Sequence, residues 1–430
     1  MRERIDWYDE FVNFDYAPAK DDLICLYYFE PAKGISPKEA IGRIASESSA
    51  GTWTTLHKLP ERVERIKARA FEVKGSYVKV AYPIDLWEPG NAPQLLSGIA
   101  GNIFGMKALK NLRLIDASLP ESYIRSYKGP GLGIRGIRSI LKVEKRPITG
   151  AVPKPKIGFS AQEHAEIAYE TWMGGFDLVK DDENLTSTTF NRFEDRVERM
   201  AKLRDRAEKE TGEQKDALLN ITGETKEMIR KVKFLHDYGF RLAMIDVVTC
   251  GTASVQTMRE ECSDLGIAIH AHRAMHAAFD RNPRHGISMY FLAKIMRLIG
   301  VDEIHTGTAV GKLVGTKKEV VGIANMLRDS HVEPGSVLAQ DWGSIKPVLP
   351  VSSGGLHPGL VPSVMRILGN NCTLLVSGGI HGHPDGTRPG AKAVMQAIEA
   401  TMEGTDIKEF AQTHRELQQA LNKWGDLKPK

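Results

Sequence analysis

The sequence lacks the features that mark secreted and membrane proteins. It has four cysteines in 430 residues, with no CxxC pair or zinc-like spacing, which predicts reduced thiols in a cytoplasmic protein. The cysteines are Cys25, Cys250, Cys262 and Cys372. The N-terminal stretch MRERIDWYDE is charged and contains no apolar core, so no secretory signal is visible. The most apolar stretch, 95–109, is too short to span a bilayer and is interrupted by Asn102 and Lys107, so we expect no membrane partner.

The sequence also lacks a strong charge of either sign. Its 58 basic and 54 acidic residues leave a net charge of +4, and no block of lysine and arginine is present. Proteins that bind nucleic-acid backbones usually carry such a block, so we expect no nucleic-acid partner. The hydrophobic content of 42% and the charged content of 26% are those of an ordinary folded enzyme. A chain of 430 residues is long enough for two domains.

Residues 1–130 predict a small α+β domain. Strand-like runs at 23–31 and 77–87 are separated by a helical run at 36–48, and neither type dominates. We expect this domain to have a ferredoxin-like fold. A segment rich in glycine and proline follows at 127–138, and we place the domain boundary there.

Residues 131–430 repeat one pattern, in which an extended apolar run is followed by a polar or glycine-rich segment and an amphipathic helix. The eight runs are TGAVPKPK (149–156), FDLVKDDE (176–183), ALLNITGE (217–224), RLAMIDVVTCG (241–251), AIHAHRAM (268–275), EIHTGTAVGK (303–312), VLPVSSGG (348–355) and LLVSGG (374–379). Eight near-equal units predict a (β/α)8 or TIM barrel, followed by a C-terminal helical tail. A doubly wound sheet is the alternative.

Charged residues lie at the predicted carboxyl ends of these strands, where TIM barrels place their active sites. The second run ends in Lys180, Asp181, Asp182 and Glu183. Alternation along a strand puts Lys180 and Asp182 on one face and Asp181 on the other, and Glu183 lies at the strand exit. A plain salt-bridge cluster is one interpretation, in which Lys180 neutralises one acid. That interpretation leaves two carboxylates uncompensated.

A carboxylate pair of this kind suits Mg²⁺, which prefers oxygen ligands. A cationic lysine beside the metal would be repelled. The conflict disappears if Lys180 carries a carbamate, because addition of CO₂ to the neutral amine turns a cation into an anionic oxygen ligand. Lys180, Asp182 and Glu183 would then hold one Mg²⁺ and leave positions open for substrate.

Basic side chains follow the first, fifth and sixth strands. They are Lys154 and Lys156, then His270, His272 and Arg273, and then His305 and Lys312. Lys154 and Lys156 are two residues apart and point to one face, although a surface turn with two solvated lysines is an equally good interpretation. A lone histidine is usually a satisfied core residue. Histidine with arginine at a barrel strand end favours phosphate binding or proton transfer.

Glycine-rich segments end the seventh and eighth strands, at 352–355 and 377–379. These are the strands whose loops usually form the phosphate site of a TIM barrel, because exposed backbone N–H groups bind the anion. The barrel therefore predicts a metal-dependent enzyme that acts on a bisphosphorylated sugar.

These residues resemble those of a known family, the large subunit of ribulose-1,5-bisphosphate carboxylase/oxygenase (RuBisCO). GGFDLVKDDEN (174–184) is similar to the metal-site motif of the family, and further motifs match in the family order through both predicted domains. They are ESSAGTWTT (47–55), GNIFGMKALKNLRL (101–114), KPKIG (154–158), HRAMHA (272–277), HTGTAVGKL (305–313) and PVSSGGLH (350–357). The VPKPK form, the short chain and the absence of a plant-like C-terminal extension are most similar to the archaeal form III enzymes.

The resemblance implies an activity and an assembly. The activity would be Mg²⁺-dependent carboxylation of ribulose 1,5-bisphosphate with CO₂ and water to two 3-phosphoglycerate, through an enediolate. O₂ would react with the same enediolate in a side reaction. The assembly would be a homodimer or a set of dimers with shared sites and no small subunit.

The resemblance also implies roles for individual residues. Lys180 would be the carbamylated lysine, with Asp182 and Glu183 as the other Mg²⁺ ligands. The other catalytic residues would be Lys154 (proton donor to the final carbanion), Lys156 (support of the enediolate), His272 (proton relay), Lys312 (closing loop), and Glu47 and Asn102 (completing the site of a partner subunit). The phosphate-binding residues would be Arg273, His305 and Ser353 for one group, and Gly354, Gly355, Gly378, Gly379, Thr52 and Trp53 for the other.

Two positions depart from the family pattern. Ser377 stands where many relatives have a glycine, and Val152 stands where many have a threonine. RuBisCO-like proteins, which run tautomerase or isomerase chemistry on sugar phosphates without fixing CO₂, are the main alternative. They usually lose parts of the carboxylase set, whereas Lys154, His272 and Lys312 are present here. A non-catalytic sugar-phosphate binding protein is the third reading, and it would need neither the metal cluster nor the loop lysine.

Overall fold

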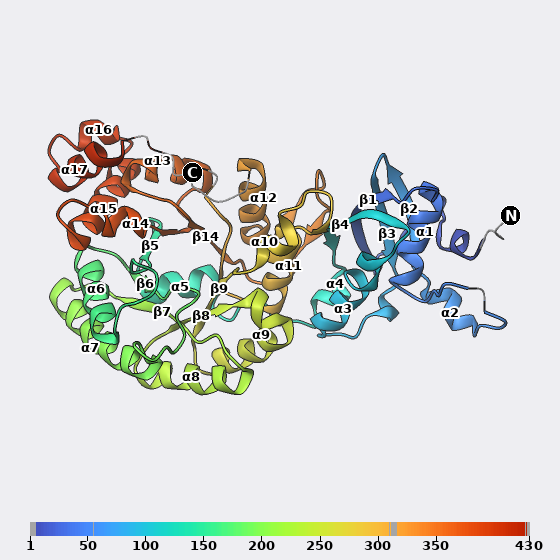
Figure 1. Ribbon diagram of the computed structural model, residues 1–430, viewed down its shortest axis with the longest axis horizontal. Coiled ribbons are helices and arrows are strands. Elements are labelled where there is room, and N and C mark those ends of the chain that lie inside the picture. Colours follow the sequence, from blue (N-terminus) through green and yellow to red (C-terminus); the bar gives the residue numbers. More distant parts are fainter. Residues whose placement is uncertain (1–5, 55, 309, 311–315, 426, 428–430) are drawn as a thin grey trace. The chain divides into compact units, whose positions relative to one another are not determined.

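The computed structural model describes residues 6–54, 56–308, 310, 316–425 and 427 (Figure 1). Contacts divide the chain into two compact units. The first contains the described residues up to Lys128, together with Met275–Ile299 and Asp329–Ile345. The second contains Gly129–Ala274, Gly300–Arg328 and the described residues from Lys346 onward. The predicted boundary near residue 130 lies beside the junction of Lys128 and Gly129; the two later segments of the first unit were not part of that prediction.

The first unit is built on a sheet with the strand order β10-β4-β1-β3-β2. Its strands are β1 (Leu23–Pro31), β2 (Arg69–Lys74), β3 (Tyr77–Tyr82), β4 (Leu109–Ser118) and β10 (Gly286–Ile287). Helices α1 (Pro37–Glu47) and α2 (Glu61–Ile66) lie between β1 and β2, and α3 (Ala92–Ile99) lies between β3 and β4. The antiparallel order β4-β1-β3-β2 with these crossings is the ferredoxin-like arrangement, so the predicted fold is confirmed.

Two segments from the middle of the chain belong to this first unit. Strand β10 pairs in parallel with β4, and helix α11 (Met289–Ile299) contacts the same strand. The sequence predicted α11 as a barrel helix, and the helix does form. It belongs with the N-terminal sheet because it contacts β4, where the Lys294 amine pairs with Asp116. Nearly all residues of the helix are buried. The short hairpin of β12 (His331–Val332) and β13 (Gln340–Asp341) lies in the same unit.

The second unit contains a closed barrel of eight parallel strands, as predicted. Its strands are β5 (Ile148–Ala151), β6 (Leu178–Lys180), β7 (Asp216–Asn220), β8 (Leu242–Asp246), β9 (Ala268–His272), β11 (Glu303–His305), β14 (Leu349–Ser353) and β15 (Thr373–Leu375). The strands follow one another around the barrel in chain order, and β15 pairs with β5 to close it. All eight predicted strand runs therefore form barrel strands, and the doubly wound alternative is wrong.

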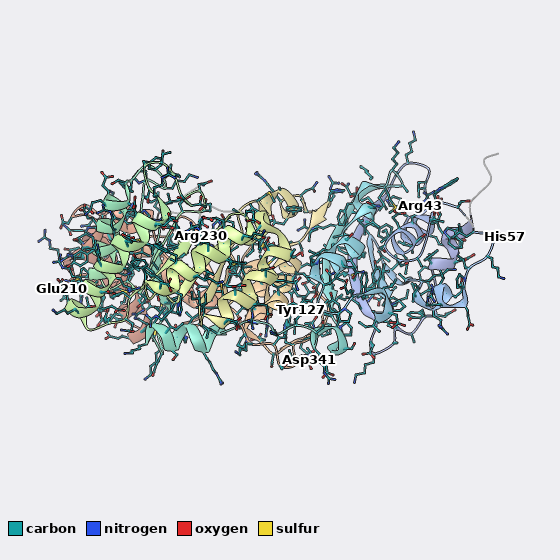
Figure 2. The ribbon with its side chains drawn as sticks, turned by 90° about the horizontal axis from the view of Figure 1, so that it is seen from below. Arg43, His57, Tyr127, Glu210, Arg230 and Asp341 are labelled. Carbon is teal, nitrogen blue, oxygen red and sulfur yellow. The ribbon has the colours of Figure 1, made fainter. Side chains whose placement is uncertain are left out.

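Helices cover the outside of the barrel (Figure 1). They are α6 (Ala161–Met173), α7 (Phe193–Thr211), α8 (Thr225–Asp237), α9 (Val247–Asp264), α12 (Lys317–Arg328), α13 (Val361–Leu368) and α15 (Thr387–Glu403), and α16 (Ile407–Phe410) and α17 (Arg415–Trp424) form the C-terminal tail. The outer faces of α7 and α8 carry exposed ion pairs, among them that of Glu194 with Arg230. Arg230 is labelled in Figure 2. No helix in the described part of the chain is both long and apolar enough to cross a membrane.

The two ends of the barrel differ in polarity. The first residues of several strands, such as Ile148, Leu178 and Leu242, pack with helix α5 (Gly133–Leu141) in one apolar cluster. Strands β7 and β8 are buried at every position, which is typical of parallel strands covered by helices. Charged and polar side chains gather at the opposite, carboxyl ends of the strands, so the site must be sought there.

Candidate active site

A cavity of about 560 Å³ opens at the carboxyl ends of the barrel strands. Most of the residues predicted from the barrel sequence line it. They are Lys154, Lys156, Lys180, Asp182, Glu183, His272, His305, Ser353, Gly354, Gly355, Gly378 and Gly379. Residues that are far apart in the sequence are thus brought to one place by the strand order of the barrel.

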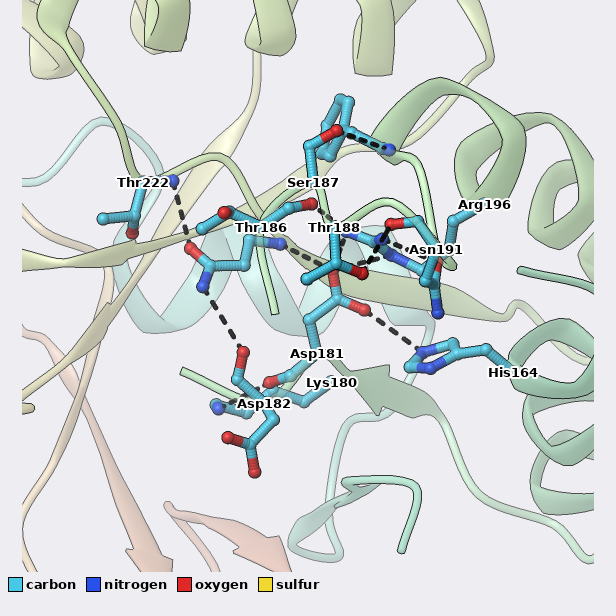
Figure 3. Close-up of polar contacts among 12 residues, drawn as sticks. His164, Lys180, Asp181, Asp182, Thr186, Ser187, Thr188, Asn191, Arg196 and Thr222 are labelled. Carbon is cyan, nitrogen blue, oxygen red and sulfur yellow. Dashed lines mark hydrogen bonds and ion pairs between the residues drawn. The ribbon is translucent and has the colours of Figure 1, made fainter. Parts of the chain in front are cut away.

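The aspartate at position 181 points away from this cavity, as the alternation predicted. Its carboxylate accepts hydrogen bonds from Nε and Nη2 of Arg196 at 3.1 and 2.9 Å. His164 Nε2 lies 3.2 Å from its other oxygen (Figure 3). Burial alone would raise the pKa of Asp181, but the Arg196 guanidinium, His164 and the backbone N–H of Asn220 together outweigh burial and hold that pKa below its usual value. One of the three carboxylates therefore anchors the end of β6 to helix α7.

Lys180 lies on the other side of the strand end, inside the cavity wall. Its side chain is 1% exposed, and Nζ donates a hydrogen bond of 2.8 Å to the carbonyl oxygen of Asp181. Within the described residues it forms no ion pair, so the plain salt-bridge interpretation of the run is wrong for Lys180. Burial lowers the pKa of this amine, and the neighbouring carboxylates of Glu183 and Asp246 act in the opposite direction. A lowered pKa favours the neutral amine, which is the form that reacts with CO₂.

Asp182 and Glu183 face the same cavity with basic partners. Lys154 Nζ lies 3.1 Å from Asp182 Oδ2. Burial would raise the pKa of Asp182, but Lys154 and hydrogen bonds from Asn184 lower it overall. Glu183 Oε2 lies 3.7 Å from Nε2 of His272. Both carboxylates thus present oxygen atoms on the cavity wall that can ligate a metal.

These donors fit a small hard cation such as Mg²⁺. Asp182 and Glu183 supply two carboxylates, and a carbamate on Lys180 would supply a third anionic oxygen in the same cavity. In the described part of the chain, no three or more His, Cys, Asp or Glu side chains group together as a ready metal site. The fit therefore depends on the chemical state of Lys180.

Lys154 and Lys156 reach the cavity by a different route from the one predicted. Strand β5 ends at Ala151, so strand alternation does not extend to these lysines. They lie in the irregular segment beyond it, where Lys156 is exposed and Lys154 is partly buried. Both nevertheless line the cavity, and the interpretation as two solvated surface lysines is wrong for Lys154, which pairs with Asp182.

The histidines at the ends of β9 and β11 are held by neighbouring side chains. His272 Nδ1 lies 3.1 Å from Asp246 Oδ1 at the end of β8. Burial, followed by the nearby Lys180 amine, lowers the pKa of His272. His305 Nδ1 lies 2.7 Å from Ser353 Oγ. A neutral, oriented imidazole that faces a cavity is suited to carry protons in either direction.

The glycine-rich segments line the side of the cavity formed by β14 and β15. Gly354 and Gly355 have φ angles of 112° and 74°, a backbone region that side chains disfavour. At Gly379 an added Cβ would lie 2.4 Å from the carbonyl oxygen of Leu356. The two departures from the family pattern meet each other here, because the N–H of Val152 donates to Ser377 Oγ at 3.0 Å. The serine hydroxyl thus joins the strand ends of β15 and β5.

Several predicted residues lie elsewhere. Arg273 is buried beside Gly307 and is not among the residues that line the cavity. Lys312 lies outside the described residues. The remaining four are in the first unit: Glu47 ends helix α1, Asn102 begins the short helix η3 (Asn102–Gly105), and Thr52 and Trp53 follow α1. Glu47, Asn102 and Trp53 are exposed, and α1 contacts η3. Their roles in a shared site stay predictions.

The structure adds residues that the sequence did not single out. Asp246 orients His272, and its place after an apolar run was a signal that could have identified it. His357, Trp424 and Leu427 also line the cavity. His357 stacks on Trp424 with 5.8 Å between ring centroids, and its Nε2 lies 2.7 Å from the carbonyl oxygen of Leu427. Nothing local in the sequence of the tail indicates that it reaches the barrel cavity.

Comparison with known proteins follows the same division of the chain. Residues 10–123 match the N-terminal domain of the ribulose bisphosphate carboxylase large chain, and residues 133–424 match its catalytic domain. The chain belongs to the ribulose bisphosphate carboxylase large chain family. The predicted resemblance is therefore confirmed.

Individual members of this family are similar along the whole chain. The ribulose bisphosphate carboxylase of Pyrococcus abyssi is 53% identical, with 99% of each chain covered. The crystal structure of the octameric enzyme from Pyrococcus horikoshii OT3, described as a complex with sulfate ion, has a TM-score of 0.92 at 52% identity and 98% coverage of both chains. The dimeric archaeal enzyme from Hyperthermus butylicus has a TM-score of 0.93 at 47% identity, with 97% of this chain and 99% of that chain covered. The predicted likeness to archaeal ribulose bisphosphate carboxylases is also confirmed.

Proposed function

We propose that the protein catalyses the Mg²⁺-dependent carboxylation of ribulose 1,5-bisphosphate, with CO₂ and water, to two molecules of 3-phosphoglycerate. One observation carries the proposal. In a chain of the ribulose bisphosphate carboxylase family, Lys180, Asp182 and Glu183 line the same cavity as the basic residues Lys154 and His272. This cavity therefore offers acid, base and metal-binding groups to one substrate.

The metal site is completed by modification of Lys180. Its neutral amine attacks CO₂, a C–N bond forms, the amine loses a proton, and a carbamate results. The carbamate, Asp182 and Glu183 would hold one Mg²⁺. When bound, this ion supplies positive charge that stabilises the negative charge developing on substrate oxygens.

The residues of the chain supply the proton transfers. Lys180, as its carbamate, would help to remove the proton at carbon 3 of the bisphosphate, and Lys156 would support the resulting enediolate. His272, oriented by Asp246, relays protons during hydration. Lys154, whose amine is held 3.1 Å from Asp182, donates the final proton to carbon 2 of the carbanion.

The phosphate groups bind at the glycine-rich strand ends and at the basic residues near β9 and β11. Gly354, Gly355, Gly378 and Gly379 offer backbone N–H groups to one phosphate, together with Thr52 and Trp53 of a partner subunit. Arg273 balances the charge of the other phosphate near His305. Lys312 closes over the bound substrate, and O₂ competes with CO₂ for the enediolate.

We propose a homodimer, or an assembly of dimers, without a small subunit. Glu47 and Asn102 would complete the cavity of the partner. Glu47 and Asn102 are exposed and therefore accessible to a partner subunit, as is Trp53, which is 72% exposed. Relatives at about half sequence identity are described as octameric and dimeric.

A radiolabel assay tests the proposal. The purified chain is preincubated with labelled bicarbonate and Mg²⁺, ribulose 1,5-bisphosphate is added without oxygen, and acid-stable label in 3-phosphoglycerate is counted. We expect label that depends on Mg²⁺ and on the preincubation. A folded oligomer that incorporates no label would refute carboxylation, and a screen of enolisable sugar phosphates would then test the tautomerase alternative.

A further inference from the structure

A continuous chain of buried hydrogen bonds crosses the interior of the barrel and ends at the cavity. Thr373 Oγ1 donates to Glu303 Oε2 at 2.8 Å, and Glu303 Oε1 lies 2.7 Å from His270 Nδ1. His270 Nε2 lies 2.9 Å from His305 Nε2, and His305 Nδ1 lies 2.7 Å from Ser353 Oγ. Glu303, His270 and Thr373 are fully buried, and neither Glu303 nor His270 lines the cavity.

The carboxylate at one end fixes the direction of every bond in this chain. A carboxylate has acceptors but no donor, so His270 must donate to it from Nδ1. A neutral imidazole carries one N–H, so His270 Nε2 can then only accept, and His305 must donate from Nε2. His305 Nδ1 is left as an acceptor, and it takes the hydroxyl hydrogen of Ser353. His270 and His305, whose rings meet edge-on at an interplanar angle of 85°, are therefore opposite tautomers.

The surroundings support neutral rings. Burial lowers the pKa of His270, although Glu303 acts in the opposite direction. Burial also lowers the pKa of His305, and the neighbouring His272 and His270 rings lower it further. Glu303 therefore faces a neutral partner rather than an imidazolium.

We propose that Glu303 and His270 are positioning residues that turn the hydroxyl hydrogen of Ser353 inward, so that Ser353 meets the substrate as an acceptor of a sugar hydroxyl hydrogen and not as a donor to a phosphate. This inference rests on the proposed function, because it assigns one contact of the same sugar bisphosphate. Ser353 lines the cavity, and its outward lone pairs are free of the hydrogen that His305 holds. Through His270 and His305, the fully buried carboxylate of Glu303 thus sets the orientation of the Ser353 hydroxyl at the cavity.

The arrangement of protons can be measured without turnover. Long-range ¹⁵N–¹H correlation spectra of histidine-labelled protein report which ring nitrogens carry hydrogen, and the His270→Asn and His305→Asn variants assign the signals. We expect hydrogen on Nδ1 alone for His270 and on Nε2 alone for His305. A doubly protonated His270, or one protonated on Nε2 alone, would overturn the proposal.

Replacing Glu303 by glutamine keeps the shape but removes the fixed direction, since an amide can donate or accept at His270. Glu303→Gln should mix the two tautomer patterns and lower kcat/KM for ribulose 1,5-bisphosphate about tenfold. The matched control is Glu194→Gln, a partly exposed carboxylate of the same unit that pairs with Arg230, and it should change neither quantity. Unchanged tautomers and unchanged kcat/KM in Glu303→Gln would contradict the role of the carboxylate.

A double-mutant cycle separates positioning from structural support. If Glu303 acts through the serine hydroxyl, Glu303→Gln should cost little in a Ser353→Ala background. Equal costs in both backgrounds would show that Glu303 acts elsewhere. Ser353→Ala should also weaken binding of ribulose 1,5-bisphosphate about tenfold while leaving the affinity for inorganic phosphate unchanged. A matching loss of phosphate affinity would overturn the acceptor role. A wild-type chain without carboxylase activity would refute the proposed function, and the tautomer spectra would still decide the direction of the hydrogen bonds.

Discussion

Each of the two units buries a lysine completely beside carboxylates, and the two lysines are used differently. In the first unit, Lys294 Nζ lies 2.5 Å from Asp116 Oδ1 and donates to the carbonyl oxygen of Ala117 at 2.8 Å. Asp116 also accepts from the backbone N–H groups of Ala117 and Leu338. In the barrel, Lys180 bonds to a backbone carbonyl and borders a cavity, and its neighbouring carboxylates Asp182 and Glu183 turn towards that cavity.

The difference separates a structural buried charge from a reactive one. Burial lowers the pKa of both lysines, so the pKa alone does not distinguish them. What distinguishes the two lysines is whether the neighbouring carboxylates pair with the lysine amine inside the protein or face a cavity. Lys294 and Asp116 satisfy each other, whereas Lys180 borders the cavity, where we propose that it takes up CO₂. Four experiments test this contrast.

The largest expected effect is the loss of activity in Lys180→Met. Methionine fills similar space without an amine, so the carbamate and the third metal oxygen are lost. We expect Mg²⁺-dependent carboxylation to fall at least about a thousandfold, with a melting temperature equal to or above that of the wild type. Radiolabel turnover and calorimetry measure the two quantities. Near-normal turnover would remove Lys180 from the metal site.

Lys294→Met should show the reverse pattern. It leaves the carboxylate of Asp116 buried without its cation, which costs about 3–5 kcal/mol of stability. Turnover per folded molecule should stay at the wild-type value, because Lys294 does not line the cavity. Denaturant unfolding and active-site titration with a tight-binding inhibitor give the two numbers. A stable variant with lost turnover would contradict the contrast drawn between the lysines.

Asp181→Asn tests the outward face of the same strand end. The amide keeps the size of the side chain but loses the ion pair with Arg196, so we expect about 1–3 kcal/mol of lost stability. Activity should fall far less than in Lys180→Met, since Asp181 points away from the cavity. Equal losses of activity in the two variants would show that the Asp181–Arg196 ion pair cannot be separated from the metal site.

The smallest expected effect is the pH dependence of that stability difference. The pKa of Asp181 is lower in the folded chain than the ordinary value of about 3.9, so its contribution is fully present above that pH and is lost as the pH falls through the folded pKa. The stability difference between the wild type and Asp181→Asn should therefore be constant near neutral pH and shrink in acid. A difference that grows on acidification would give the wrong sign for a lowered pKa.

The contrast also shows how far the sequence leads. The eight barrel strands and the opposite faces of Asp181 and Asp182 could be predicted because strand periodicity is local. The motif order along the chain was sufficient for the family. The side-chain partners could not be predicted. The pairs Asp181–Arg196, Asp182–Lys154 and His270–Glu303 depend on how elements distant in sequence pack together.

The grouping of the middle segments was missed for the same reason. Helix α11 has the apolar periodicity of any barrel helix, and no local signal records that its lysine will pair with Asp116. Trp424 likewise sits at the end of an ordinary amphipathic helix, and only the path of the tail brings it to the cavity. Local pattern specifies the elements, and long-range packing specifies their neighbours.

The closure of the barrel has a consequence for how the protein is made. Strand β5 obtains its second neighbour only from β15, and the bond from Val152 to Ser377 crosses that seam. A ribosome delivers β5 long before β15, so one edge of the growing sheet stays open until the chain beyond Leu375 has emerged. The N-terminal sheet also stays incomplete until β10 and α11, which contact β4, have been synthesised. A nascent chain that stops halfway cannot complete either sheet. The active site can therefore form only in the last stage of translation.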